Sequence, residues 1–173
     1  MMRWILIAAA TIAGALAVAA LIGWRLPLPH RASREQMMAA TPESVWAAIN
    51  DVEAFPSWRT DVKTVRRLPD REGRPAWVED GGSGKITFVV ERSDAPRLLV
   101  TRIADPDLPF GGTWTYEITP AAQGSRLRIT EDGEIYNPLF RFMARFIFGY
   151  EATIASYFNA LEARLDPSSR RAR

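Results

Sequence analysis

The stretch NPLFRFMARFIFGYEATIASYFNALEARL, residues 137–165, carries the strongest fold signal in the sequence and contains five of the eight Phe residues. Asn137 followed by Pro138 is a typical helix start, a capping residue before a proline at the first helical position. Bulky apolar residues then recur at steps of three and four, the spacing of one helix face. They are Leu139, Phe142, Met143, Phe146, Tyr150, Ile154, Tyr157, Leu161 and Leu165. We therefore predict one long helix that needs a broad, concave partner.

The residues before this helix supply a suitable partner. After Trp58 the apolar residues follow a period of two, which indicates antiparallel strands separated by turn-forming residues. The predicted strands cover 61–68, 76–80, 85–92, 98–104, 113–119 and 127–135, and a further strand is predicted at 33–40. Thr41 and Pro42 begin a short helix, and residues 52–58 form a second helical turn. The fold class is thus α+β, a curved antiparallel sheet of about seven strands around a long C-terminal helix.

An apolar N-terminal run precedes this domain. No charged residue occurs from Trp4 to Trp24, and as a helix this run reaches about 30 Å, the thickness of a bilayer core. Tryptophan at both ends suits the two membrane interfaces. A cleaved signal peptide is the alternative, with small residues at 17–19, but the run exceeds a usual signal core. We predict a transmembrane anchor over 1–24.

The remaining organisation follows from this anchor. Residues 25–32, with two prolines, are predicted to be a juxtamembrane linker, 33–165 the domain, and 166–173 a disordered basic tail. Only Arg3 precedes the span, whereas Arg25, Arg31 and Arg34 follow it. The distribution of positive charge therefore favours a single-pass protein with a cytoplasmic domain.

Composition excludes several classes of function. The chain has 22 basic and 20 acidic residues, so a broad nucleic-acid surface is not expected. Without cysteine there are no disulfides, thiolate catalysis or Cys-ligated metal. His30 is the only imidazole and precedes the predicted domain, which argues against a Ser-His-Asp triad or a His-rich metal site. We predict no metal and no cofactor, and the oligomeric state stays open.

Three short motifs resemble one protein family. TPESVW at 41–46, FPSW at 55–58 and FGGTW at 110–114 resemble polyketide cyclase/dehydrase-type members of the START-related (SRPBCC) superfamily over residues 33–165. The order of one strand, two short helices, six strands and a closing helix is that of the helix-grip fold. The resemblance implies a sheet curled around the helix and an apolar cavity. Members bind lipids, sterols, polyketides, quinones or plant hormones, and a minority are enzymes. Many bacterial members have no assigned ligand, so the resemblance leaves the ligand open. We expect the anchor to lie in a bacterial inner membrane.

Two carboxylates are the candidates for chemistry. Glu131 shares a strand face with Leu127 and Ile129, and an enclosed acid among apolar residues has a raised pKa. It is therefore a candidate general acid or hydrogen-bond partner for a ligand. The alternatives are that an arginine pairs with it or that a bulge turns it outward. Glu79, on the face of Trp77, is a candidate companion.

The predicted ligand-binding residues lie on the inner face of the sheet and on the helix. Tyr116, Glu131 and Tyr150 are the candidates for orienting a ligand, because apolar pockets fix ligands with few polar groups. The loop 105–112, with Leu108 and Phe110, is a candidate lid. For each lining residue the alternative is plain core packing. The lining is predicted to contain Phe88, Trp114, Tyr116, Glu131, Phe142, Phe146 and Tyr150.

These observations predict a membrane-anchored domain that binds a hydrophobic small molecule or lipid in an internal cavity. A cyclase or dehydratase type of enzyme that uses Glu131, with Glu79, as acid or base is one alternative. A membrane-tethered interaction module with a filled core is another. Arg141 and Arg145, one helical turn apart, are candidates for contact with anionic head groups.

Overall fold

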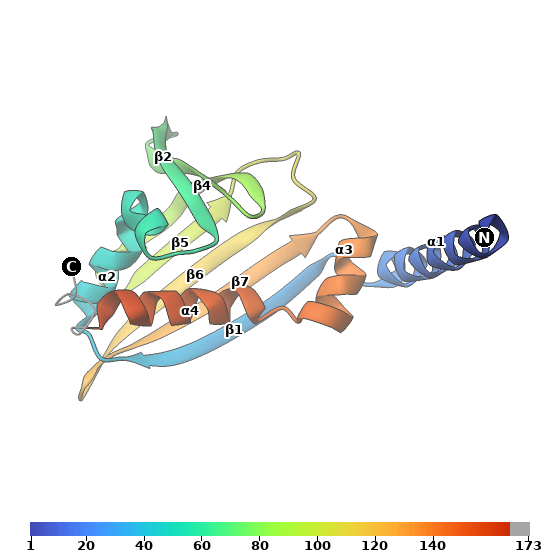
Figure 1. Cartoon of the computed structure of the whole chain (residues 1–173). Helices are drawn as coiled ribbons and strands as arrows, with labels where there is room; N and C mark the ends of the chain where they lie inside the picture. Colours follow the sequence, from blue (N-terminus) through green and yellow to red (C-terminus); the bar gives the residue numbers. More distant parts are fainter. Residues whose placement is uncertain (167–173) are drawn as a thin grey trace.

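The computed structural model describes residues 1–166, and Figure 1 shows the order of its elements along the chain. The predicted tail 166–173 lies outside this range apart from Asp166. The elements are α1 (Met2–Arg25), β1 (Pro29–Met38), α2 (Pro42–Asn50), the 3-10 helix η1 (Val52–Ser57), β2 (Val62–Arg71), β3 (Arg74–Gly81), β4 (Gly84–Asp94), β5 (Leu98–Ile103), β6 (Phe110–Ala121), β7 (Gly124–Ile135), α3 (Pro138–Met143), the π-helix η2 (Ala144–Phe148) and α4 (Ala152–Leu165).

The strands form one antiparallel sheet of seven strands in the order β1-β7-β6-β5-β4-β3-β2. Strands β2 to β7 are a meander, and β1 pairs with β7 to complete the sheet. Helix α4 crosses one face of the curved sheet, and α2 and η1 cover its far end (Figure 1). The predicted α+β helix-grip fold is confirmed.

Strand β1 begins earlier than the sequence analysis predicts. Its pairing with β7 starts at Pro29, inside the stretch 25–32 for which a linker is predicted. Proline is tolerated there because β1 is an edge strand and its missing N–H breaks no interior ladder. His30, which the sequence analysis places before the domain, therefore lies within the sheet. The only imidazole of the chain is thus part of the domain, contrary to the prediction.

Helix α2 begins as predicted. The side chain of Thr41 accepts a hydrogen bond from the backbone N–H of Ser44 at 3.3 Å, and Pro42 is the first helical residue. Val45 and Ile49 are buried against the sheet, so the short helix contributes one apolar face to the core.

The C-terminal helix is divided, in contrast to the uninterrupted helix predicted over 137–165. Helix α3 continues into the π-helix η2, and Gly149 follows with a φ of 75°, a conformation that glycine adopts at low cost. Helix α4 then starts at Ala152 and runs in a different direction (Figure 1). Apolar residues recur at steps of three and four on both sides of the break. This spacing describes the side chains only, so it does not reveal that the backbone leaves the helical conformation at Gly149.

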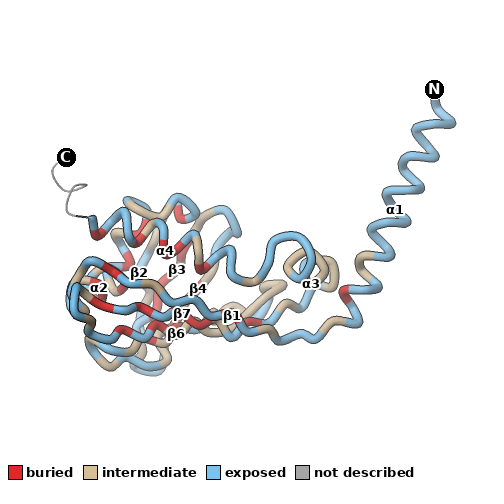
Figure 2. Tube along the Cα trace, turned by 90° about the horizontal axis from the view of Figure 1, so that it is seen from below, coloured by how far each residue is buried: buried red, intermediate tan, exposed pale blue. Residues whose placement is uncertain are grey.

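Helix α1 extends away from the domain with its apolar side chains exposed (Figures 1 and 2). By length and composition it can cross a membrane, although a signal sequence meets the same criteria. Its last turn packs against α3. Gly23 is buried there, and a Cβ atom at this position would lie 1.9 Å from the carbonyl oxygen of Pro138.

The main core lies where α2 and α4 meet the sheet, and buried residues gather there in Figure 2. Fully buried apolar side chains of α4 pack on those of β6 and β7 in this region. They include Ile118, Leu127, Ile129, Ile154, Phe158 and Leu161. A smaller cluster of Val52, Phe55, Val62 and Trp77 joins η1 to β2 and β3.

Candidate functional site

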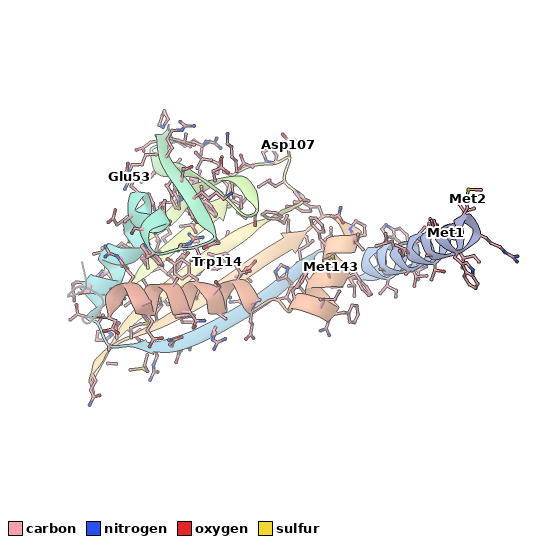
Figure 3. The ribbon with its side chains drawn as sticks, viewed as in Figure 1. Met1, Met2, Glu53, Asp107, Trp114 and Met143 are labelled. Carbon is pink, nitrogen blue, oxygen red and sulfur yellow. The ribbon has the colours of Figure 1, made fainter. Side chains whose placement is uncertain are left out.

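A row of inward side chains crosses the sheet beside the main core. The strand register places Ala32 opposite Glu131, Glu131 opposite Trp114, Trp114 opposite Thr101, and Thr101 opposite Val90. Directly opposite residues of antiparallel strands share a face, so these five belong to one side of the sheet. Figure 3 shows Trp114 on the face that α4 crosses.

Glu131 has an imidazole as its neighbour. Nε2 of His30 lies 3.5 Å from Oε1 of Glu131, and the two side chains are 10% and 21% exposed. The ring of Tyr150 stacks on His30 with a centroid distance of 4.3 Å and an interplanar angle of 16°. Within residues 1–166 the titratable side chain next to Glu131 is thus His30 and not an arginine.

The surroundings favour the neutral forms of both groups. Burial raises the pKa of Glu131 to about 7, and a hydrogen bond from Trp114 opposes this shift. Burial also lowers the pKa of His30. Nδ1 of His30 is buried and has no hydrogen-bond partner among the described residues. Glu131 can therefore gain or lose a proton near neutral pH, and Nδ1 of His30 is available to a polar group that enters the site.

Glu79 belongs to a separate cluster. Oε2 of Glu79 lies 3.1 Å from Nη1 of Arg59, and Oε1 accepts a hydrogen bond from Nε1 of Trp77 at 2.9 Å. Nη2 of Arg59 also lies 2.6 Å from Asp61. Burial raises the pKa of Glu79, whereas Arg59 and Trp77 oppose this shift. Because both carboxylate oxygens already have partners, Glu79 ties the loop after η1 to β3.

Tyr157 of α4 fills the space near this cluster. Its ring centroid lies 5.6 Å from that of Trp58, 5.9 Å from that of Trp114 and 5.7 Å from that of Tyr116. The guanidinium of Arg59 also lies over the Tyr157 ring at 5.4 Å. Tyr116, one of the predicted ligand-orienting residues, is consequently buried in packed aromatic core.

Part of the inner face of the sheet is incompletely covered. Phe88, Trp114, Glu131 and Tyr150 are half-buried, in contrast to Tyr116 and Tyr157. Phe88 stacks on Trp77 with a centroid distance of 5.4 Å and packs against the smaller cluster of η1, β2 and β3. Of the predicted binding residues, the structure therefore groups Glu131 and Tyr150 around His30, with Trp114 next to Glu131.

Phe142 and Phe146 lie elsewhere. They are on α3 and η2, with their rings 5.0 Å apart, and the Cβ atom of Phe142 is next to Gly23 of α1. Phe146 is exposed to solvent. The break at Gly149 thus moves both residues from the face of the sheet, where one long helix would put them, to the end of the domain next to α1.

A surface hollow lies next to His30, mostly on the face of the sheet opposite α4. Its lining residues Pro29, Arg31, Asp132 and Glu134 alternate along the strands with the inward His30 and Gly133. The hollow has a volume of about 340 Å³ and is lined by Pro29, His30, Arg31, Asp132, Gly133 and Glu134. These residues are at the ends of β1 and β7 that lie closest to α1 and α3 (Figure 1). A second hollow of about 440 Å³ lies beside the loop before β6 and shares Asp132 and Glu134 with the first.

The predicted lid loop is held at both ends. Asp105 accepts a hydrogen bond from the backbone N–H of Thr87, and the carbonyl of Pro109 accepts one from the N–H of Tyr136 at 2.8 Å. Phe110 is the first residue of β6 and not part of the loop. Leu108 alone of the two predicted lid residues therefore remains in the loop.

Sequence reasoning misses three residues of these clusters: His30, Arg59 and Tyr157. His30 is missed because the prolines around it indicate a linker. The signal that could have found it is its spacing of two residues from Ala32, which puts both on the same face of a strand. Arg59 lies in a loop and has no periodic signal. Tyr157 is on the predicted helix face, but its contact with Arg59 depends on the folded positions of α4 and η1.

A seven-stranded sheet that holds a C-terminal helix, with polar groups on its inner face, defines a START-like domain of the helix-grip type. The chain belongs to the family described as polyketide cyclase / dehydrase and lipid transport, whose model matches residues 29–165. A comparison with curated protein sequences finds no match.

Solved structures share the fold at low sequence identity. A START superfamily protein from Mycobacterium smegmatis is 21% identical with a TM-score of 0.62, over 80% of this chain and 97% of that one. The aromatase/cyclase Zhui from Streptomyces sp. R1128 is 14% identical with a TM-score of 0.63, over 84% and 96%. The di-domain aromatase/cyclase StfQ of the steffimycin pathway is 14% identical with a TM-score of 0.65, over 84% of this chain and 53% of that one.

Proposed function

We propose that this protein binds a hydrophobic small molecule or lipid between the sheet and α4, at the end of the domain next to α1. In this proposal α1 crosses a bacterial inner membrane and the domain lies on the cytoplasmic side. The observation that carries the proposal is the cluster of Glu131, His30 and Tyr150 on a half-buried inner face. Family membership supports a hydrophobic ligand, since its description includes lipid transport.

The chemistry of the inner face fits such a ligand. Phe88, Val90 and Trp114 offer apolar surface that is only partly covered by the protein itself. Burial of ligand surface against them contributes about 25 cal/mol per Å². His30 and Glu131 then supply the few polar groups that orient a ligand in an apolar site. The orphaned Nδ1 of His30 gains a partner if the ligand carries a hydroxyl or carbonyl group.

The anchor adds to this function. Tethering the site to the bilayer raises the effective concentration of membrane-dissolved ligands around it. His30 is at the same end of the domain as α1, so in this proposal the site lies close to the membrane surface.

The test is mass spectrometry of the compounds that copurify with the full-length protein in mild detergent. We expect a defined apolar compound with the unmodified protein and its loss in Val90→Trp, because the new indole occupies the inner face. Thr119→Trp places the same side chain at an exposed position of β6 and is the matched control. Equal amounts of bulk lipid with all three proteins, or none with any, would refute a specific internal site.

An enzyme of cyclase or dehydratase type is the second candidate. The observation that favours it is an acid with a pKa of about 7 beside an imidazole, which can donate and accept protons at neutral pH. Incubation of the protein with its copurifying compound, or with that compound's hydroxylated analogues, tests for turnover. Loss of turnover in Glu131→Gln with retained binding would establish catalysis, whereas unchanged compounds with the unmodified protein would leave binding as the function.

A further inference from the structure

Four large apolar side chains at the α1 end of the domain are exposed: Phe140, Phe146, Ile147 and Phe148. The last three are 56%, 62% and 61% exposed. We call residues 140–148 the aromatic segment. After residue 25, the other exposed large apolar residues of the described chain are Leu28, Met37 and Tyr136. Leu28 and Tyr136 flank the same end, so the exposed apolar surface of the domain is concentrated there, which is unusual for a surface that faces water.

The aromatic segment is fixed to the end of α1. Gly23 lets the backbone of α3 approach α1 closely, since a Cβ atom at this position would lie 1.9 Å from the Pro138 oxygen and 3.4 Å from the Phe142 Cβ. Nη1 of Arg141 donates a hydrogen bond to the carbonyl of Leu26 at 3.4 Å, just beyond α1. The aromatic segment is therefore held, through α3, at the end of α1 that would leave a membrane.

The charge of the aromatic segment favours a lipid surface. It contains the exposed Arg145 and no acidic residue, and its other arginine, Arg141, is buried against the end of α1. The Arg145 guanidinium lies over the Phe146 ring at 5.8 Å, and that of Arg25 over the Trp24 ring at 5.7 Å. Within the described chain, no salt bridge is formed by these three arginines. Aromatic side chains with interleaved arginines suit the boundary between head groups and acyl chains.

We propose that the aromatic segment is a second membrane-contacting element, which lies in the interfacial layer of the bilayer beside α1. Phe146, Ile147 and Phe148 insert among the acyl chains, and Arg145 contacts lipid phosphates. The break at Gly149 serves this arrangement because it directs α3 and η2 away from the sheet and toward the end of α1. Figure 3 shows Met143 at this end of the domain, close to α1.

The contact fixes the orientation of the domain. A single helix followed by a linker would let the domain rotate freely, whereas two contacts hold the ends of β1 and β7 against the membrane surface. The hollow next to His30 then opens close to the head groups. The inference rests on the membrane position of α1 in the proposed function, but it does not depend on the identity of a ligand.

The absence of natural cysteine allows a direct test in the full chain. We would introduce Phe148→Cys, Ile12→Cys or Met37→Cys, attach a spin label, and reconstitute each protein in vesicles of phosphatidylethanolamine and phosphatidylglycerol. Met37 is the matched control because it is 50% exposed on β1, within the folded domain. Collision with dissolved oxygen reports lipid exposure, and collision with an aqueous nickel complex reports water exposure. Circular dichroism verifies that each variant is folded.

The expected result is a several-fold higher ratio of oxygen to nickel accessibility at position 148 than at position 37. A water-exposed label at 148 with a lipid-exposed label at 12 would overturn the inference and leave α1 as an anchor. A label at 148 that is shielded from both reagents would also overturn it, in favour of a protein contact. Water exposure at both 12 and 148 would overturn the inference together with the membrane part of the proposed function.

Discussion

His30 of the first strand and Glu131 of the last meet on the inner face of the sheet, with Nε2 of one 3.5 Å from Oε1 of the other. The contact follows from the register in which Ala32 lies opposite Glu131 and His30 opposite Gly133. Gly133 makes room for the imidazole, since a Cβ atom there would lie 2.4 Å from Cε1 of His30. The site therefore depends on β1 beginning at Pro29.

The stability of the protein should depend on pH through Glu131. Its pKa is raised from 4.5 to about 7 in the folded state, so its stabilising contribution is complete below about pH 4.5 and is lost as pH rises to about 7. The loss is at most about 3 kcal/mol. Relative to the unmodified protein, Glu131→Gln should gain stability over this range. Urea unfolding in detergent at several pH values, followed by tryptophan fluorescence, measures the difference, and parallel curves would contradict the prediction.

His30 should have the opposite effect. Burial lowers its pKa in the folded state, so its contribution is present above about pH 6.5 and is lost as pH falls. Relative to the unmodified protein, His30→Gln should therefore gain stability toward acid. The same unfolding series measures this change, and a variant that instead gains stability toward alkaline pH would show that the imidazole is charged in the folded protein.

The Tyr150 ring should maintain the raised pKa of Glu131 by covering the pair. Tyr150→Ala removes the ring that stacks on His30 at 4.3 Å and admits water, so the pKa of Glu131 should fall toward 4.5. Tyr150→Phe keeps the ring and should leave this pKa unchanged. Infrared titration of the carboxyl band provides the measurement. An equal fall in both variants would assign the effect to the hydroxyl group instead of to burial.

The ion pair between Arg59 and Glu79 should be important for stability. Both side chains are mostly buried, and Arg59→Ala leaves a buried carboxylate without its partner, at a cost of about 3–5 kcal/mol. Arg97→Ala removes an exposed bridge to Asp94 and should cost less than about 1 kcal/mol. Chemical unfolding of the two variants provides the comparison. Similar losses would mean that solvent reaches the Arg59 pair.

The close contact between α1 and α3 should depend on Gly23. Gly23→Ala places a methyl group on the Pro138 carbonyl and should separate the helices, which exposes the buried Arg141 to trypsin. Gly14→Ala is the control, because nothing lies within 4 Å of a Cβ atom there. The rate of cleavage after Arg141 in detergent measures the effect. Equal rates in the two variants would show that the helices are not packed in solution.

The sequence determines most of the fold because its signals are local. Alternation of apolar residues predicts the meander, and Thr41 before Pro42 predicts the start of α2, since each depends on neighbouring residues. The apolar face of 137–165 likewise predicts helix. It does not predict the break, because the spacing shows which side chains are apolar and not whether the backbone stays helical. Gly149 is the one local sign of an interruption.

The tertiary structure alone decides the partners of the charged residues. Strand parity puts Glu131 and Glu79 on the inner face, but it does not indicate that His30 meets the first and Arg59 the second. Those pairings depend on strand register and on the path of the loop after η1, which no local pattern specifies. The position of Phe146 is decided in the same way. Its helical spacing predicts a wall of the cavity, whereas the turn at Gly149 places it beside α1, where its exposure is the basis of the proposed membrane contact.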